Sequence, residues 1–222
     1  MTHSVTGKRE RSYSGPERVM QLLKRNGPAD ATTLASELHV TGAAIRQHLY
    51  VLRDRGWVTA RDELRPMGRP AKIWELTAAA DEYFPRADSP LVGSLLKSVQ
   101  ATLGREGMER VICGCVNEQV DRYQSALRSQ RTLPAKLGAL VAMRSEDGFM
   151  AEVRSEIDGS FLFFENHCPL AQAVENCADL CDAELKIFRA ALGAEVSVER
   201  LEHMAGGDRR CAYRITRQPL KA

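Results

Sequence analysis

The pattern of apolar and polar positions changes its period near residue 56. Before it, apolar side chains recur three and four residues apart, which predicts helices over 14–27, 30–40 and 41–56. After Gly56, "WVTARD" and "AKIWELT" alternate and predict two strands joined by the basic loop "ELRPMGRP". The inward faces of the three helices are Val19, Leu22 and Leu23; Leu34, Ala35 and Leu38; and Ile45, Leu49 and Leu52.

Three helices followed by a basic hairpin predict a winged helix-turn-helix over residues 14–80, with its turn in "LHVTG". Residues 1–76 carry 13 Lys and Arg against 8 Asp and Glu, whereas the remainder carries 18 against 21. This asymmetry indicates a polyanion partner, here double-stranded DNA. We expect DNA contacts from Thr41, Ala43, Arg46 and Gln47 on the third helix and from Arg65, Arg69 and Lys72 in the wing. Residues 1–13 predict a disordered tail.

Residues 81–146 predict a hinge and a helical dimerisation region. "LVGSLLKSVQATLG", "MERVICGCVNEQVDRYQSALRSQ" and "LPAKLGALVAMR" have helical spacing, and their apolar stripes need a partner surface. A twofold homodimer would match a palindromic operator. Cys113 and Cys115 stand two residues apart and face different sides of a helix, so we expect buried thiols rather than ligands of one metal.

The last segment, 147–222, predicts an α+β domain, so the whole chain is expected to be α+β. Two strands flank the turn "IDGS", a helix carries "CADLCDAELKIFRAALG", and "AEVSVERLEHMAGGDRRCAYRIT" reads as a final hairpin. No apolar run approaches the ~18 residues of a spanning helix. The first residues also lack the apolar core of a secretory signal. We therefore expect a cytoplasmic protein without a membrane partner.

Four of the six cysteines lie in this last segment, with the spacing Cys168-x8-Cys177-x3-Cys181-x29-Cys211. On a helix, Cys177 and Cys181 would share a face, and Pro169 is placed to begin a helix whose dipole favours a Cys168 thiolate. We expect the four thiols to converge on one pocket. A structural zinc site usually has two C-x₂₋₄-C pairs, and only one is present; an iron–sulfur cluster tolerates scattered ligands. His167 and His203 are available as bases for a nucleophilic cysteine, but no catalytic-triad signature accompanies them.

The motifs "GRPAKIWELT", "ENHCPLAQAVENCADLCDAELKIFRAALG" and "GDRRCAYRI" resemble the SufR-like family, from about residue 15 to 216. These bacterial regulators are often grouped with winged-helix repressors of the ArsR/DeoR type. The resemblance implies a homodimeric repressor of iron–sulfur assembly genes that binds a [4Fe-4S] cluster. It implies Cys177, Cys181 and Cys211 as cluster ligands. It also suggests Cys168 as the fourth ligand, with His167 and His203 as alternatives.

The resulting hypothesis is a transcription regulator, not an enzyme, whose DNA affinity depends on a cluster that responds to oxidative or nitrosative stress or to iron status. Three alternatives remain open at this point. One is a zinc-bound or thiol-based redox sensor on the same scaffold. Another is an iron–sulfur electron-transfer or thiol enzyme. The third is a small-molecule-sensing regulator whose cysteines belong to the core.

Overall fold

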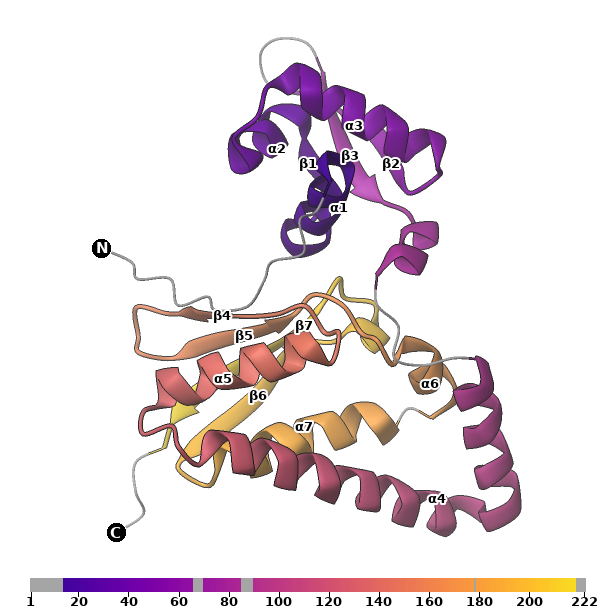
Figure 1. Cartoon of the computed structure of the whole chain (residues 1–222), viewed down its shortest axis with the longest axis vertical. Coiled ribbons are helices and arrows are strands. Elements are labelled where there is room, and N and C mark those ends of the chain that lie inside the picture. The colour runs from indigo at the N-terminus through magenta and orange to yellow at the C-terminus, as the bar shows by residue number, and fades with distance from the viewer. Residues whose placement is uncertain (1–13, 66–69, 85–89, 178, 219–222) are drawn as a thin grey trace. The chain divides into compact units, whose positions relative to one another are not determined.

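The computed structural model describes residues 14–65, 70–84, 90–177 and 179–218. The chain divides into two compact units, Met1–Tyr83 and Phe84–Ala222, which we call unit 1 and unit 2 (Figure 1). The predicted tail over 1–13 and part of the predicted hinge lie outside the described residues. Within the described part of the chain, no helix is long and apolar enough to cross a membrane.

Unit 1 has the helices and the hairpin that the sequence predicts. Helices α1 (Gly15–Asn26), α2 (Ala31–Leu38) and α3 (Gly42–Asp54) precede strands β2 (Val58–Glu63) and β3 (Ala71–Leu76). A strand of two residues, β1 (Ala29–Asp30), was not predicted; it extends the hairpin to a sheet of order β1-β3-β2. The 3₁₀ helix η1 (Ala78–Tyr83) closes the unit and is tied to α1 by Lys24 and Asp81, 2.7 Å apart.

The helices of unit 1 begin where polar side chains satisfy free backbone donors. Asp30 accepts from the Thr33 amide at the start of α2, and Thr41 accepts from the Ala44 amide at the start of α3. The predicted inward faces supply most of the core: Val19, Leu23, Leu34, Ile45, Leu49 and Leu52 are all buried. These side chains bury the apolar stripes of all three helices together, leaving the outer face of α3 to solvent.

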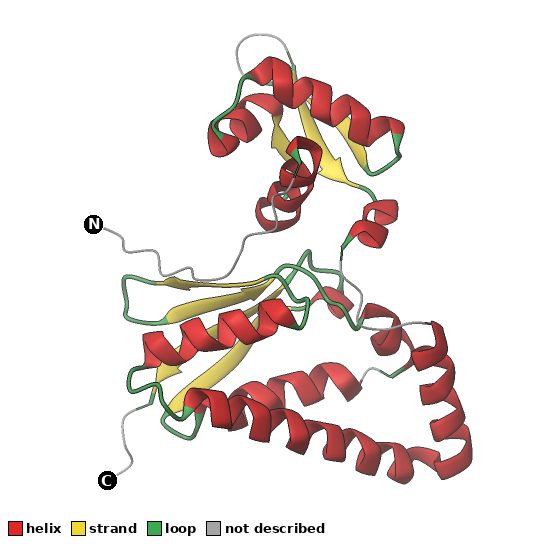
Figure 2. Ribbon diagram, viewed as in Figure 1, coloured by secondary structure: helices red, strands yellow, loops and turns green. Residues whose placement is uncertain are grey.

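Unit 2 is built on an antiparallel sheet of order β4-β5-β7-β6. Its strands are β4 (Ala151–Ser155), β5 (Phe161–Glu165), β6 (Val196–Glu202) and β7 (Cys211–Arg217). Helices α5 (Leu133–Glu146) and α7 (Asp179–Leu192) pack with the sheet, and Phe188 of α7 stacks on Tyr213 of β7 at 4.8 Å (Figure 2). Two short helices, α6 (Ala171–Asn176) and η2 (Met204–Gly206), lie in the connections.

Helix α4 (Pro90–Leu127) consists of two helical segments that meet at Gly104. Gly104 has φ 65° and ψ −171°, a conformation open essentially to glycine alone, and the chain turns there (Figure 1). Tyr123 and Leu127 at the end of α4 belong to the same apolar core as the sheet. The region predicted as a helical domain, 81–146, and the region 147–222 are therefore largely joined in one unit.

The prediction that Cys113 and Cys115 are buried is wrong, because both residues of α4 are exposed. Met108 and Ile112 form the buried stripe of this segment. Val116, one turn further on, packs against it. Positions 113 and 115 fall on either side of that stripe, so the helix turns both side chains toward solvent.

Candidate functional site

The outer face of α3 presents the side chains predicted to contact DNA. Thr41, Ala43, Arg46 and Gln47 are all exposed, around the N-terminal end of the helix. Thr41 also caps the helix, so its hydroxyl has a structural task. His48 on the same helix has a packing role, because its ring lies against Gly15, where an added Cβ would come within 2.2 Å of Nε2.

The cations predicted in the wing differ in their surroundings. Lys72 is exposed on β3. Arg65 forms an ion pair with Asp30 of β1, which also caps α2, so the Arg65 guanidinium is partly committed to the fold. Arg69 lies outside the described residues.

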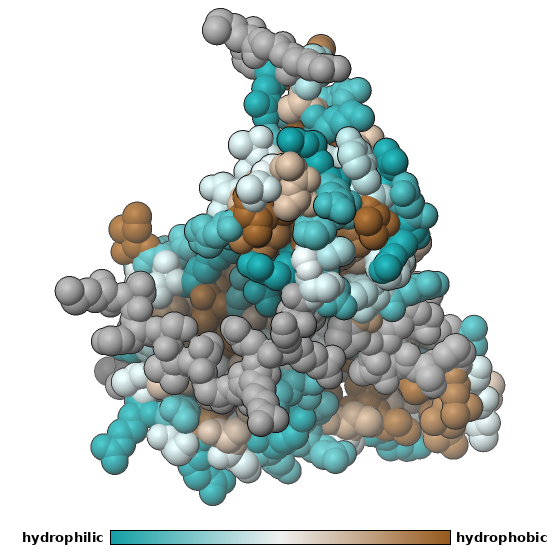
Figure 3. Space-filling view, turned by 45° about the horizontal axis from the view of Figure 1, so that its top comes forward, coloured by the Kyte–Doolittle hydropathy of each residue, from teal (hydrophilic) through white to brown (hydrophobic). Residues whose placement is uncertain are grey.

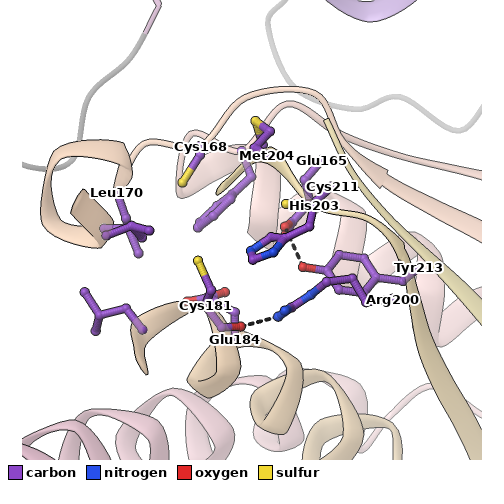
Figure 4. A pocket seen from close by; sticks show the side chains of 13 residues that line it. Glu165, Cys168, Leu170, Cys181, Glu184, Arg200, His203, Met204, Cys211 and Tyr213 are labelled. Atoms are coloured by element: carbon purple, nitrogen blue, oxygen red, sulfur yellow. Dashed lines mark hydrogen bonds between the residues drawn. The ribbon is translucent and has the colours of Figure 1, made fainter. Parts of the chain in front are cut away.

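Three of the four C-terminal cysteines line one pocket in unit 2, together with His203. Cys168 follows β5, Cys181 lies in the first turn of α7, and Cys211 begins β7. Figure 4 shows the three thiols and the His203 imidazole facing the same space. The pocket is small and partly open to solvent, with a cavity volume of about 30 Å³. Its apolar wall consists of Phe149, Leu170, Val174, Leu180 and Met204.

The three cysteine-bearing segments are held by backbone contacts. Cys211 lies opposite Glu165 in the β5–β7 register. The segment before Cys168 is anchored to the loop before β4, where the His167 amide donates to the Phe149 carbonyl at 3.1 Å. At Cys181 the carbonyl accepts from Arg200 of β6. The pocket therefore joins α7 to both central strands of the sheet and to the edge strand β6.

Cys177 does not line this pocket, and it does not share a helix with Cys181. The residue ends α6 with φ −152° and ψ 89°, and α7 begins only at Asp179. Its side chain is 8% exposed and packs in a small apolar cluster with Met108, Ile112 and Ala183. The predictions that Cys177 and Cys181 share a helical face and that all four thiols converge on one pocket are therefore wrong for Cys177.

The prediction of a helix dipole acting on Cys168 is also wrong. Helix α6 begins at Ala171, so Pro169 and Leu170 separate the thiol from the first helical residue. Burial raises the pKa of Cys168 to about 12 and the pKa of Cys211 to about 11. The pKa of Cys181 is also raised by burial, against an opposing effect of Arg200. In the metal-free protein the three thiols are therefore protonated and neutral at pH 7.

Charged side chains from the sheet and from α7 line the pocket together with the thiols. Glu165 and Glu184 contribute carboxylates, and Arg200 is the cation among the described lining residues. Behind them, Arg144 of α5 is 1% exposed and donates from Nε to Glu165 at 2.6 Å and from Nη2 to Glu184. Burial raises the pKa of Glu165, and the nearby Arg144 offsets part of that rise.

Arg144 also connects the pocket to α4. Its Nη1 donates to the Tyr123 hydroxyl at 3.1 Å, and that hydroxyl donates to Asp147 at 2.8 Å. Sequence analysis missed this network, although Glu165 ends an apolar strand run, "FLFFE", where a buried charge needs a partner. Arg144 itself gave no comparable signal, because it looks like an ordinary basic residue in the last turn of a helix.

Two of the buried side-chain atoms without a hydrogen-bond partner belong to this pocket. Among the described residues, such atoms are Asn166 Oδ1, Arg200 Nε and His203 Nε2. Burial lowers the pKa of His203, and Arg200 adds to the effect, so the imidazole is neutral at pH 7. His167, in contrast, does not line the pocket; it is 4% exposed, and its ring lies tilted against Phe84 with the ring centres 5.6 Å apart.

A metal centre needs several donor side chains close enough together to bind it at once. Among the described side chains, no group of three or more His, Cys, Asp and Glu is placed to hold a metal ion. Four sulfurs around one zinc would lie about 3.8 Å apart, from Zn–S bonds of about 2.3 Å. The donor types that line the pocket, three thiols and one imidazole, fit the ligand chemistry of either zinc or an iron–sulfur centre.

No protein-family model matches the chain, and no curated protein matches it. One solved structure that aligns with it is Bacillus subtilis PadR in complex with operator DNA. The alignment covers 60% of this chain and 93% of that chain at 13% sequence identity, with a TM-score of 0.28. At this TM-score the similarity supports no conclusion about fold or function.

Proposed function

We propose that this chain is a DNA-binding transcription regulator whose unit 2 holds an iron–sulfur cluster, of the [4Fe-4S] type that the SufR-like resemblance implies. The observation that carries the proposal is the pocket in which Cys168, Cys181 and Cys211, from three separate elements, face the same space (Figure 4). The exposed face of α3, with Arg46 and Gln47 near its N-terminal end, supports the DNA-binding part.

Of the cysteines that the resemblance suggests, the proposed ligand set keeps Cys168, Cys181 and Cys211, which line the pocket. It leaves out Cys177, whose thiol packs among apolar side chains outside the pocket. Cys168, Cys181 and Cys211 would hold the cluster as thiolates. Arg200 and Arg144 would offset the negative charge that these thiolates add beside Glu165 and Glu184.

Control of DNA affinity would act through α7 and α4. When bound, such a cluster supplies a centre that oxidants and nitric oxide destroy. Cys181 lies on α7, which packs along α4, and Arg144 joins two pocket carboxylates to Tyr123 of α4. Helix α4 is the first helix after the linker from unit 1. Changes in the pocket can therefore reach the segment that connects to the DNA-binding unit.

A homodimer is part of this proposal. Hydrophobic residues gather over the first segment of α4, where Leu91, Leu95 and Leu103 are 74%, 59% and 52% exposed (Figure 3). Apolar side chains exposed along one helix are typical of a surface that pairs with a second copy. A twofold dimer would present two α3 helices to a palindromic operator.

The test is DNA binding by the cluster-bound and cluster-free protein. Duplexes that bind the anaerobically prepared protein would first be enriched from a random-sequence library. The enriched duplex would then be used in fluorescence anisotropy titrations at several salt concentrations. We expect affinity that falls with salt and at least about a tenfold difference between the two forms, the range of allosteric coupling.

Two variants sharpen this test. Cys181→Ala should behave like the cluster-free protein, whereas Cys113→Ala, at an exposed thiol outside the pocket, should behave like the wild type. Equal DNA affinity with and without the cluster would exclude cluster control and leave a regulator of another kind. Absence of any salt-dependent DNA binding would instead favour an electron-transfer or thiol enzyme.

A further inference from the structure

A four-iron centre in this pocket would need a fourth ligand besides the three cysteines. Three cysteines line the pocket, and a four-iron centre has a fourth iron to coordinate. Two side chains of the earlier candidate set, Cys177 and His167, do not line it. His203 does line it, and its Nε2 is buried with no hydrogen-bond partner. A buried imidazole nitrogen without a partner is costly unless a bound group satisfies it.

The local backbone holds His203 in place beside Cys211. The His203 amide donates to the Asp208 carboxylate at 2.7 Å, and the His203 carbonyl accepts from the Gly206 amide at 2.8 Å. Gly207, with φ 98°, lets the chain turn back toward β7. The turn over residues 203–208 therefore positions both the imidazole and the thiol that begins β7 on one wall of the pocket (Figure 4).

Charge favours a neutral fourth ligand here. The pocket already contains Glu165 and Glu184, and cluster binding adds three thiolates. Arg200 is the cation among the described lining residues, with Arg144 behind the two carboxylates. A fourth thiolate would add one more negative charge to this partly buried space, whereas an imidazole adds none.

We propose that His203 binds the fourth iron through Nε2, so that the centre is held by Cys168, Cys181, Cys211 and His203, while Cys177 serves only packing. This inference rests on the proposed function, because it assumes an iron–sulfur centre in the pocket. A histidine ligand makes the centre less negative than four cysteines would, which raises its reduction potential.

The test uses full-length protein labelled with ¹⁵N only at histidine and reconstituted without oxygen. Pulsed electron paramagnetic resonance of the reduced centre should show ¹⁵N coupling in the wild type and in Cys177→Ala, and lose it in His203→Ala. His39→Asn, at an exposed histidine of unit 1, is the control for labelling. Far-ultraviolet circular dichroism of each variant checks that unit 2 remains folded.

Cluster lifetime in air provides the second readout. Loss of His203 should shorten it by about tenfold or more, since even partners of metal ligands change affinity by about 10–100-fold. His203→Cys should restore the lifetime without the nitrogen signal. The inference is overturned if His203→Ala keeps the ¹⁵N coupling, or if Cys177→Ala loses the cluster while folded; the proposed function would survive both results. A wild-type protein that takes up no iron and sulfide would overturn both proposals.

Discussion

Replacing Arg144 with methionine should lower the free energy of unfolding of unit 2 by about 3–5 kcal/mol, the usual cost of removing one partner from a buried ion pair. Arg144 is 1% exposed, and its guanidinium holds Glu165 at 2.6 Å and contacts Glu184 and Tyr123. The side chain of Glu165 is only 3% exposed, so water cannot replace the lost cation. In a unit of this size, the loss corresponds to a fall in Tm of roughly 10 °C.

The loss of unfolding free energy in Arg144→Met should also depend on pH, because a protonated Glu165 carries no charge and needs no cationic partner. Burial already raises the pKa of Glu165, and removal of Arg144 takes away the group that opposes the rise. In the variant the folded state then holds a proton that the unfolded chain has released above pH 4.5. Its stability therefore decreases as pH rises above that value, and the deficit relative to wild type is larger at pH 8 than at pH 5.

Urea unfolding at pH 5 and pH 8, followed by circular dichroism, measures both effects. Arg154→Met is the matched control: Arg154 pairs with Glu152 at 3.1 Å on the surface, and its loss should cost at most about 1 kcal/mol. Adding Glu165→Gln to Arg144→Met should recover part of the loss and remove most of its pH dependence. Equal destabilisation by Arg144→Met and Arg154→Met would refute the reasoning.

Four further predictions concern the thiols, the kink, the DNA face and Arg200. The pKa values of Cys168 and Cys211 are raised to about 12 and about 11, so the folded protein keeps protons that the unfolded chain releases above about pH 9. The free energy of unfolding of the metal-free protein should therefore fall between pH 9 and pH 12. In a Cys168→Ala/Cys211→Ala variant it should fall less steeply. Gly104→Ala should cost about 1–3 kcal/mol in thermal unfolding through backbone strain alone, since nothing lies within 4 Å of the added carbon. Gly114→Ala, in the helical part of α4 and equally free of contacts, should stabilise the protein by about 0.5–1 kcal/mol. A Gly104→Ala variant more stable than Gly114→Ala would contradict the kink at Gly104. Arg46→Ala should change sequence preference at one base pair and cost about 1–3 kcal/mol of DNA binding, whereas Lys72→Ala should mainly reduce the salt dependence; an effect of Lys72→Ala on sequence preference would be unexpected. Arg200→Met removes the buried Nε donor from the pocket wall and should lower the cluster's reduction potential in redox titration; an unchanged or higher potential would show that Nε does not act on the centre.

Periodicity predicted most of the longer helices and strands of the fold. The helical stripe Ile45, Leu49 and Leu52 and the alternating segments at the C-terminus are buried as expected, because burial of one face is what selects such patterns. Strand β1 has only two residues, Ala29 and Asp30, and no sequence pattern of that length distinguishes a strand from a loop. The division at residue 146 did not anticipate that Tyr123 and Leu127 share the core of the sheet, which depends on contacts distant in sequence.

The pocket was predicted in part. The spacing of the C-terminal cysteines predicted that they share a site, but the position of Cys177 depends on where α7 begins. A start at Asp179 rather than before Cys177 removes that thiol from the helical face and places it among Met108 and Ile112. The partners of Arg144 lie 21 and 40 residues away, so only tertiary structure could identify them.

The most direct test of the central claim is to purify the protein without oxygen and measure iron, acid-labile sulfide, zinc and the visible spectrum on one sample. The account predicts a brown protein with about four irons and four sulfides per chain, and nearly complete loss of both in Cys181→Ala but not in Cys113→Ala. A colourless protein that carries stoichiometric zinc, or no metal after reconstitution with iron and sulfide, would contradict it.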